Sequence, residues 1–332
     1  MLTHFRMLKR SMMILYREAE ITLKTMLQSA HPRWWSTWLA LGVLWLLAKL
    51  PYPWLLKLGA IFGWLLMRTI PHRRNIADVN LQLCFPNLEQ GSRRALLCRH
   101  FESLGIGIIE IALSWWAPTR RLQGLALVEG LGHLRTALKR GKGVLLITGH
   151  FTCFELAGRL LALQAHLPGR AIYRAHENPV LEWVMRRGRR QYLEKMIARG
   201  DVRTMLRSLR ANKVVWYAAD QNYGHSNSAF VPFFGVPAAT TTAVSRLARM
   251  TGVAVIPFLP RRLERGEGYL LQLLAPLQDF PSNDVREDTA RINRILEEHI
   301  RWAPEQYFWI HRRFKDQPDA SASIYTKSLV TP

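Results

Sequence analysis

Apolar residues gather in two long stretches near the N-terminus of the chain. Residues 34–48 form a run of 15 without a charge, and residues 50–66 add a second apolar stretch that is broken by Pro51, Pro53, Lys57 and Gly63. A helix that spans a bilayer needs about 20 apolar residues, so the first run is short for a full crossing. We predict a membrane anchor over residues 34–50, built as one helix or as a deeply inserted hairpin.

Beyond residue 71 the pattern changes to short apolar runs that alternate with amphipathic stretches. Runs of strand length cover residues 144–148, 170–174, 214–219, 253–258 and 269–274. Helical spacing covers residues 73–86, 92–116, 154–167, 179–192, 202–211, 240–251 and 288–302. Strands that alternate with helices indicate a mostly parallel sheet with helices on both faces. We therefore predict an α/β fold with a mostly parallel mixed sheet flanked by helices, in which 269–274 is an antiparallel partner and Ser92 is an N-cap.

The two ends of the chain differ from this globular part. Residues 1–33 are basic, and their apolar residues recur at roughly helical spacing. This pattern is typical of an amphipathic interfacial helix, and a flexible arm is the alternative. Residues 317–332 are polar, which predicts a flexible tail. The expected organisation is an arm over 1–33, an anchor helix over 34–50, a globular domain over 51–316 and a tail over 317–332.

The excess of positive charge indicates which kind of molecule the protein binds. The chain holds 46 Lys and Arg against 24 Asp and Glu, a formal net charge of +22. Such an excess favours an anionic partner, either a nucleic acid, an acidic protein or substrate, or an anionic membrane. Twelve tryptophans and the apolar runs favour the membrane, and no zinc-finger spacing or RNA-recognition signature favours nucleic acid. The three cysteines are odd in number and lack metal-site spacing, so we interpret them as reduced thiols, with Cys153 a small buried hydrophobe.

Candidate chemistry is densest where the apolar run 144–148 ends. Gly149 follows the run, His150 comes next, and Glu155 lies five residues later. Histidine is well suited to take a proton near neutral pH, and a carboxylate can orient the ring and stabilise its cation. Residues five apart on a helix are about 140° apart around its axis, so we expect His150 on the turn before the helix and Glu155 in its first turns. A turn histidine with a glutamate that stabilises the helix dipole is the alternative.

Further candidates follow other predicted strands or lie on predicted helices. Asp220 and Gln221 come directly after the strand 214–219, where α/β sheets present their sites, although turn chemistry also explains them. Three threonines open the predicted helix 240–251 and could bind an anion or an oxyanion, with an N-cap as the alternative: Thr240, Thr241 and Thr242. Four arginines of the helix 179–192 suit phosphate, with a solvated basic face as the alternative: Arg186, Arg187, Arg189 and Arg190.

Six motifs in collinear order over residues 35–316 resemble those of the lipid A biosynthesis acyltransferases, the late lauroyl/myristoyl transferases of Gram-negative bacteria. The motifs are Asn80-Leu-Gln-Leu-Cys-Phe-Pro86, Gly149-His-Phe-Thr-Cys-Phe-Glu155, Tyr173-Arg174 with Asn178-Pro179, Asp220-Gln221 with Gly224, Val231-Pro-Phe-Phe-Gly235 with Ala239-Thr-Thr-Thr242, and Pro304-Glu-Gln-Tyr307 with His311-Arg-Arg-Phe-Lys315. The resemblance implies a glycerolphosphate-acyltransferase-like fold in an enzyme of the inner membrane whose catalytic domain faces the cytoplasm.

The resemblance also implies a reaction and its residues. A fatty acyl chain would move from acyl carrier protein to a hydroxyl on a 3-hydroxyacyl chain of a Kdo-lipid IVA type acceptor. The family's H-x4-D/E dyad falls on His150 and Glu155, and its phosphate-binding basic residues fall in the region of the four arginines and Arg174. Neither a metal nor an organic cofactor is expected, and no nucleic acid.

Two other functions stay open from the sequence. A glycerol-phosphate or lysophospholipid acyltransferase would use the same dyad on a different acceptor. A non-enzymatic basic scaffold that binds anionic lipid would explain the charge and the anchor, although it would leave the geometry around His150 unused.

Overall fold

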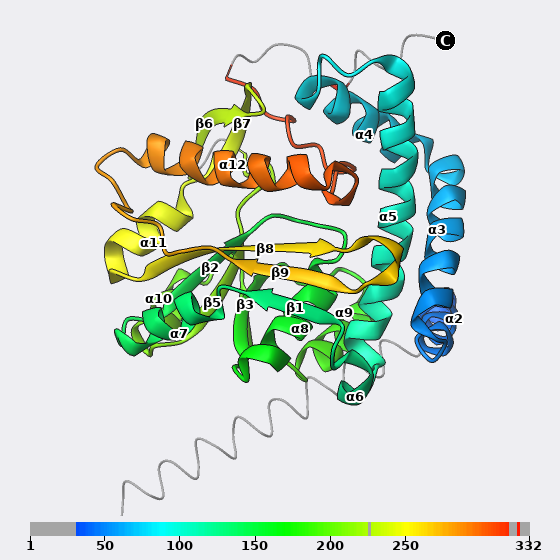
Figure 1. Ribbon diagram of the computed structural model, residues 1–332, viewed down its shortest axis with the longest axis horizontal. Coiled ribbons are helices and arrows are strands. Elements are labelled where there is room, and N and C mark those ends of the chain that lie inside the picture. Colours follow the sequence, from blue (N-terminus) through cyan, green and yellow to red (C-terminus); the bar gives the residue numbers. More distant parts are fainter. Residues whose placement is uncertain (1–30, 225–226, 319–323, 326–332) are drawn as a thin grey trace, which may run out of the picture.

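The computed structural model describes residues 31–224, 227–318 and 324–325. Almost all of the predicted arm over 1–33, and most of the predicted tail over 317–332, therefore lies outside the described residues. The rest is an α/β fold in which helices surround a central sheet, as the apolar pattern predicts (Figure 1).

The central sheet has the order β1-β9-β8-β2-β5-β3-β4. Its strands are β1 (Ala126–Glu129), β2 (Val144–Thr148), β3 (Gly169–Tyr173), β4 (Leu193–Ala198), β5 (Val214–Ala218), β8 (Ala254–Arg262) and β9 (Tyr269–Leu273). All neighbours in this sheet pair in parallel except β8 and β9, which are antiparallel. The prediction of a mostly parallel sheet with one antiparallel partner is therefore confirmed. Strand β2 lies between β8 and β5, and its first four residues are fully buried, which explains the unbroken apolar run.

Helices cover the sheet, and a separate hairpin lies beside it. The helices that follow β1 are α7 (Leu131–Lys139), α8 (Phe154–Ala165), α9 (Pro179–Arg189), α10 (Val202–Arg210), α11 (Ala243–Thr251) and α12 (Val285–Trp302). The hairpin consists of β6 (Ser228–Phe233) and β7 (Val236–Thr241). In Figure 1, α10 and α11 lie at one side of the molecule, and α2 and α3 lie at the opposite side.

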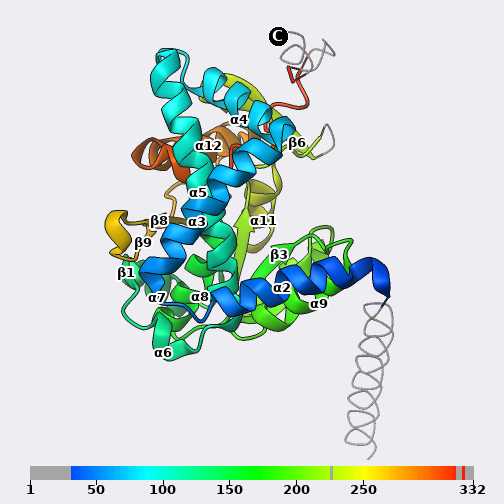
Figure 2. The same ribbon diagram turned by 90° about the vertical axis from the view of Figure 1, so that its right-hand side faces the viewer.

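The N-terminal helices pack on one long helix. They are η1 (Pro32–Trp34), α2 (Trp35–Leu47), α3 (Tyr52–Thr69) and α4 (Pro71–Cys84), and the long helix is α5 (Gln90–Trp116), which runs beside α3 in both views (Figures 1 and 2). Glycines allow this close packing. A Cβ atom added at Gly63 would lie 2.0 Å from the Phe101 carbonyl oxygen, and one at Gly105 would lie 2.2 Å from the Gly59 carbonyl oxygen. The backbones of α3 and α5 are therefore in direct contact.

Apolar side chains also cover the outer surfaces of α2 and α3. On α2 the exposed residues include Trp35 and Leu39, and on α3 they include Trp54, Ile61 and Trp64. Within the described ranges, however, the structure contains no helix with both the length and the apolar character that a membrane crossing requires. The predicted anchor over 34–50 corresponds to η1, the 13-residue helix α2 and the turn that follows it.

A buried ion pair ties these helices to the sheet. The Arg262 guanidinium of β8 binds the Glu110 carboxylate of α5, with Nη2 2.7 Å from Oε2. The Tyr269 hydroxyl of β9 donates to the same carboxylate, and the Tyr52 hydroxyl of α3 lies 2.9 Å from that of Tyr269. Burial and the charge of Glu110 raise the pKa of Tyr269 well above its ordinary value, so the phenol stays protonated and able to donate.

Several details differ from the prediction, which also contains neither β1 nor α7. Residues 240–241 belong to β7, and α11 begins only at Ala243, so the predicted helix 240–251 is wrong at its start. Ser92 lies inside α5, whose N-cap is Glu89. The hairpin β6–β7 is absent from the prediction because prolines and a glycine interrupt its apolar pattern. Strand β4 is also absent, because it is a sheet edge that carries Glu194 and Lys195.

Candidate active site

His150 lies at the carboxyl end of the sheet, on the turn between β2 and α8, as its spacing predicts. Strands β2 and β5 pair in register, with Thr148 opposite Ala218. Two residues beyond that pair, His150 and Asp220 meet. The imidazole Nδ1 lies 2.6 Å from Asp220 Oδ1, and the His150 backbone N–H donates to Asp220 Oδ2 over 2.7 Å. Asp220 therefore fixes both the ring and the backbone of the histidine.

Glu155 lies in the first turn of α8 and contacts a different set of groups. Its carboxylate accepts hydrogen bonds from Arg189 Nε and Nη2 (2.9 and 2.7 Å), Trp115 Nε1 (2.9 Å) and the Tyr192 hydroxyl (2.7 Å). These donors come from the end of α5, from α9 and from the residues after it. The predicted pairing of His150 with Glu155 is corrected, because the helix start directs Glu155 towards α5 and α9 while Asp220 holds the imidazole.

The two carboxylates are ionised at neutral pH. Burial alone would raise the pKa of Asp220, but its contacts with His150 and the positive charge of Arg313 lower that pKa well below the ordinary value. Burial would likewise raise the pKa of Glu155, and the Arg189 guanidinium with its hydrogen bonds lowers it. An ionised carboxylate can only accept hydrogen bonds, so Nδ1 of His150 carries the hydrogen that faces Asp220. In the neutral ring, Nε2 is then the nitrogen that can take a proton.

Backbone hydrogen bonds from residues near the C-terminus hold the loop that carries His150. The Phe308 backbone N–H donates to the His150 carbonyl oxygen (3.0 Å), and the Thr152 N–H donates to the Gln306 carbonyl oxygen (2.8 Å). Asn80 of α4 holds the same C-terminal segment, because its amide Nδ2 donates to the Trp309 and His311 carbonyl oxygens at 2.6 and 2.8 Å. Together with Asp220, which holds His150, four of the six sequence motifs thus meet around one loop.

His311 also reaches this region but is fixed in its neutral form. Its Nε2 accepts a hydrogen bond from the Asn222 backbone N–H over 3.1 Å. Burial lowers the pKa of His311 to about 4, against the charge of nearby Asp220, which raises it. A ring whose Nε2 is already an acceptor cannot serve as a base at that atom. Cys153 is buried as well, and burial raises the pKa of its thiol to about 12, which agrees with the predicted small hydrophobe.

The open face of His150 lines a cavity. Its side chain is 25% exposed, and the cavity of about 190 Å³ is also lined by Arg174, Gln221 and Thr241. A second cavity of about 380 Å³ lies next to it between α10 and α11, and Thr242 lines this second cavity. The two cavities share four lining residues: Arg199, Tyr217, Tyr223 and Thr241.

The remaining candidate residues do not gather at one site in the structure. Thr240 is fully buried in β7, where its hydroxyl receives a hydrogen bond from Arg313 (2.5 Å), and it lines neither cavity. The four arginines of α9 point to different neighbours. Arg186 donates to the Tyr173 hydroxyl, Arg187 lies at a cavity between α2 and α9, Arg189 pairs with Glu155, and Arg190 is exposed at the end of α9.

Sequence reasoning misses several residues of the site. Arg199 and Tyr223 lie together over the shared wall of the two cavities, with the Arg199 guanidinium 3.8 Å from the centre of the Tyr223 ring. Tyr223 lies between Gln221 and Gly224 of one quoted motif, whereas Arg199 follows the unpredicted strand β4. Among the described residues, no group of three or more His, Cys, Asp or Glu side chains is arranged to hold a metal ion.

Comparison with known proteins assigns this chain to a family. A family model for bacterial lipid A biosynthesis acyltransferases matches residues 23–316. The chain belongs to this family. A lipid A biosynthesis lauroyltransferase from Escherichia coli (strain K12) is 42% identical over 296 residues, which covers 89% of this chain and 96% of that protein.

Other relatives of this acyltransferase are named for different fatty acyl groups. A palmitoleoyltransferase from the same strain is 39% identical over 296 residues, covering 89% of this chain and 96% of that protein. A myristoyltransferase is 26% identical over 307 residues, covering 91% and 94%. The resemblance inferred from six motifs is therefore confirmed, and the protein is a late-type acyltransferase of lipid A biosynthesis, which decides against a non-enzymatic scaffold.

Proposed function

We propose that the acyltransferase moves a fatty acyl chain from acyl carrier protein to the hydroxyl of a 3-hydroxyacyl chain on a Kdo-lipid IVA type acceptor. It would work at the inner membrane with its catalytic domain on the cytoplasmic side. The observation that carries the proposal is the His150–Asp220 contact of 2.6 Å at the mouth of a cavity. This arrangement leaves Nε2 of an oriented imidazole for the acceptor hydroxyl.

The reaction then needs one base that becomes an acid. His150 Nε2 takes the proton of the acceptor hydroxyl as its oxygen attacks the thioester carbonyl. The ionised Asp220 stabilises the imidazolium that forms. When the tetrahedral intermediate collapses, the carbon–sulfur bond breaks, and the imidazolium returns its proton to the departing thiolate. The products are an ester on the acceptor and the free thiol of the carrier.

Glu155 supports this chemistry from a distance. Its four hydrogen bonds join the start of α8 to α5 and α9, and His150 lies only four residues before that helix begins. We assign Glu155 as a positioning residue rather than as the partner of the imidazole.

The surface between α10 and α11 supports an acidic carrier as the donor. The two helices expose five arginines and contain no Asp or Glu: Arg203, Arg207, Arg210, Arg246 and Arg249. The 380 Å³ cavity lies between the two helices, is lined by Arg246, and shares four lining residues with the cavity of His150. A flexible arm that carries an acyl thioester could follow this route, and the positive surface would attract its acidic carrier. The apolar surfaces of α2 and α3 lie on the opposite side of the molecule, where a bilayer-bound acceptor would approach (Figure 1).

The test offers labelled acyl carrier protein with each of two acceptors, Kdo-lipid IVA and a lysophospholipid. We expect label on Kdo-lipid IVA, and equal or faster transfer to the lysophospholipid would overturn the proposed acceptor. His150→Ala should lower turnover by about two decades or more. The matched control is His166→Asn, since His166 is an exposed histidine in a left-handed conformation that asparagine tolerates. Full turnover in His150→Ala would overturn the proposed base.

A further inference from the structure

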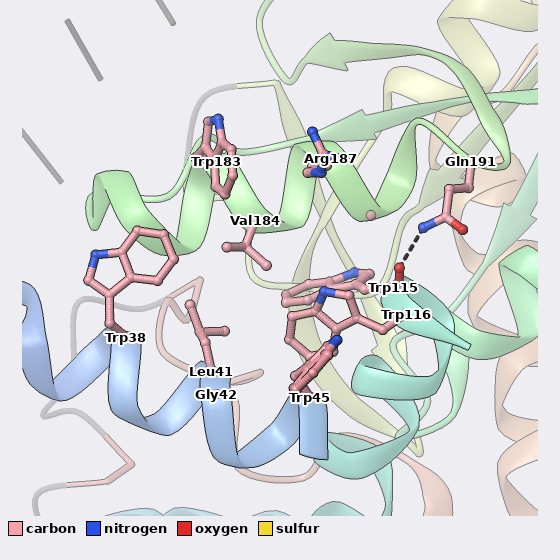
Figure 3. Close-up of a pocket in the computed structure, with 11 residues that line it drawn as sticks. Trp38, Leu41, Gly42, Trp45, Trp115, Trp116, Trp183, Val184, Arg187 and Gln191 are labelled. Atoms are coloured by element: carbon pink, nitrogen blue, oxygen red, sulfur yellow. Dashed lines mark hydrogen bonds between the residues drawn. The ribbon is translucent and has the colours of Figure 1, made fainter. Parts of the chain in front are cut away.

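Five of the twelve tryptophans line one cavity that the proposed chemistry does not use. The cavity lies between α2, the end of α5 and α9, and its volume is about 590 Å³ (Figure 3). Its tryptophans are Trp38, Trp45, Trp115, Trp116 and Trp183. This volume is about three times that of the cavity at His150 and falls in the range of cavities that bind small molecules.

The walls are held by specific contacts. Trp38 of α2 and Trp183 of α9 meet edge to face with ring centres 6.1 Å apart. Trp115 packs over Gly188, where an added Cβ would lie 2.4 Å from the indole. Gln191 donates from its side-chain amide to the Trp115 carbonyl oxygen, as the dashed line in Figure 3 shows. The cavity is thus a built feature of the interface between α2 and α9.

The lining indicates what the cavity binds. Apart from the indole N–H groups, the polar side chains that line it are Gln191 and Arg187, and no lining residue carries a carboxylate. Arg187 is exposed, and its guanidinium lies 5.8 Å from the centre of the Trp183 ring. Indole walls favour a hydrocarbon, and a guanidinium at the opening favours an anion, because its planar fork fits phosphate oxygens.

The surroundings indicate where the ligand comes from. The outer surface of α2 continues from the cavity as an apolar surface on which Leu39 is 72% and Leu46 57% exposed. Contiguous apolar surface with tryptophans is typical of a membrane contact. A chain could therefore pass from the bilayer into the cavity without crossing water.

Trp115 joins this cavity to the positioning cluster. Its indole ring lines the cavity, and its Nε1–H donates to the Glu155 carboxylate over 2.9 Å. Glu155 in turn lies at the start of α8, directly after the His150 loop. A chain bound here would be held at a fixed distance from His150 by rigid elements, which would place the rest of its lipid over the cleft.

We propose that this cavity holds one hydrocarbon chain of the acceptor lipid. The proposal rests on the proposed function for the identity of the acceptor. Filling the cavity should then weaken acceptor binding and leave the donor unaffected.

Gly42 provides a clean way to fill the cavity. It lines the cavity from α2, and a Cβ added there meets nothing within 4 Å. Gly42→Leu should therefore fold normally, since leucine is also a better helix former than glycine. Gly132→Leu is the matched control, because Gly132 lies on an exposed helical surface with the same open space.

Steady-state kinetics with labelled acyl carrier protein and Kdo-lipid IVA give the first readout. We expect Gly42→Leu to raise KM for Kdo-lipid IVA about tenfold or more, because a buried chain loses contact area, with little change in kcat or in KM for the carrier. Gly132→Leu should leave all three unchanged. An unchanged KM for Kdo-lipid IVA in folded Gly42→Leu would overturn the proposal.

Tryptophan fluorescence, measured without the acyl donor, tests the assignment of the cavity independently of the proposed acyl transfer. In micelles that contain phosphatidylglycerol brominated on its chains, the bromine quenches nearby tryptophans. Addition of Kdo-lipid IVA should relieve the quenching in the wild type and relieve it less in Gly42→Leu. Quenching that is lost in Gly42→Leu but that Kdo-lipid IVA never relieves would assign the cavity to bulk phospholipid and overturn the acceptor assignment. If Kdo-lipid IVA relieves quenching but is never acylated, the proposed function fails while the cavity assignment stands.

Discussion

Asp220 and Glu155 are two buried carboxylates near the same histidine loop, yet their partners differ in kind. Asp220, 1% exposed, binds the ring and the backbone of His150, whose side chain is 25% exposed. Glu155, 5% exposed, binds a guanidinium, an indole and a phenol that all remain in one protonation state at neutral pH.

We propose that this difference separates a carboxylate that takes part in the chemistry from one that only positions its neighbours. A carboxylate on an imidazole fixes which ring nitrogen carries the hydrogen, and it stabilises a cation that exists only during the reaction. A carboxylate whose four hydrogen bonds are permanent does neither, but it holds three segments in one arrangement. The H-x4-E motif contains the histidine and only one of the two carboxylates, Glu155, and only the neighbouring strand β5 reveals that the other carboxylate, Asp220, holds the ring.

The largest effect should come from Asp220→Asn. The amide keeps the size of the side chain but removes the negative charge and can stabilise the wrong tautomer of His150, so turnover should fall by about two decades or more. The measurement is kcat with labelled acyl carrier protein, alongside thermal melting. Turnover near the wild-type value in a folded Asp220→Asn variant would contradict the assignment of Asp220.

Glu155→Gln should act mainly on stability. It leaves the Arg189 guanidinium buried without its ionic partner, and breaking such a pair costs about 3–5 kcal/mol. Denaturant unfolding measures this loss. The double variant Glu155→Leu with Arg189→Met removes both charges and should recover most of the stability.

The double variant also tests the comparison itself. If Glu155 only positions the start of α8, turnover should recover together with stability. A double variant that is stable but as inactive as His150→Ala would show that Glu155 takes part in the chemistry, and the division between the two carboxylates would fail.

A smaller effect concerns pH. The contributions of buried histidines and of buried carboxylates to the stability of the fold are lost in different pH ranges. His100 is buried in α5, its Nδ1 lies 3.0 Å from the Glu305 carbonyl oxygen, and burial lowers its pKa to about 4. A histidine whose folded pKa lies below the ordinary value of about 6.5 contributes stability above pH 6.5, and this stability is lost as the pH falls towards 4. Asp220 and Glu155, whose pKa values are lowered, contribute stability that is lost only as the pH falls below about 4.

Melting temperatures between pH 7 and pH 4.5 separate the two ranges. The wild type should lose stability across this interval, and His100→Asn, which keeps a donor for the carbonyl oxygen, should lose less. Parallel curves for the two proteins would contradict a neutral buried His100.

Local patterns predict much of the fold and part of the site. The strand 144–148 is found at its predicted bounds because an unbroken apolar run of that length, closed by a glycine, has few other structures open to it. His150 and Asp220 both emerge from the sequence because each follows such a strand. Their contact does not emerge, since it depends on β5 lying next to β2 although β3 and β4 come between them in the chain. Order within a sheet is a property of tertiary packing, and no local spacing records it.

The helix assignments show the same limit. The four arginines of α9 form one dense basic segment in the sequence, and they face a hydroxyl, a cavity, a carboxylate and the surface in the structure. A helix turns about 100° per residue, so neighbours in the sequence separate around its axis. The sequence shows that the segment is basic, but only the position of α5 and α8 determines that Arg189 is the least exposed of the four arginines.

The glycine contact between α3 and α5 has a consequence for how this acyltransferase can evolve. Carbonyl oxygens occupy the space where side chains at positions 63 and 105 would begin, and Gly107 on the same helix meets the Thr152 carbonyl oxygen, 2.5 Å from where its own Cβ would lie. Even an alanine at these positions would wedge the helices apart and displace the loop of His150. Natural selection should therefore conserve these glycines as strictly as His150, although none of the three touches a reactant.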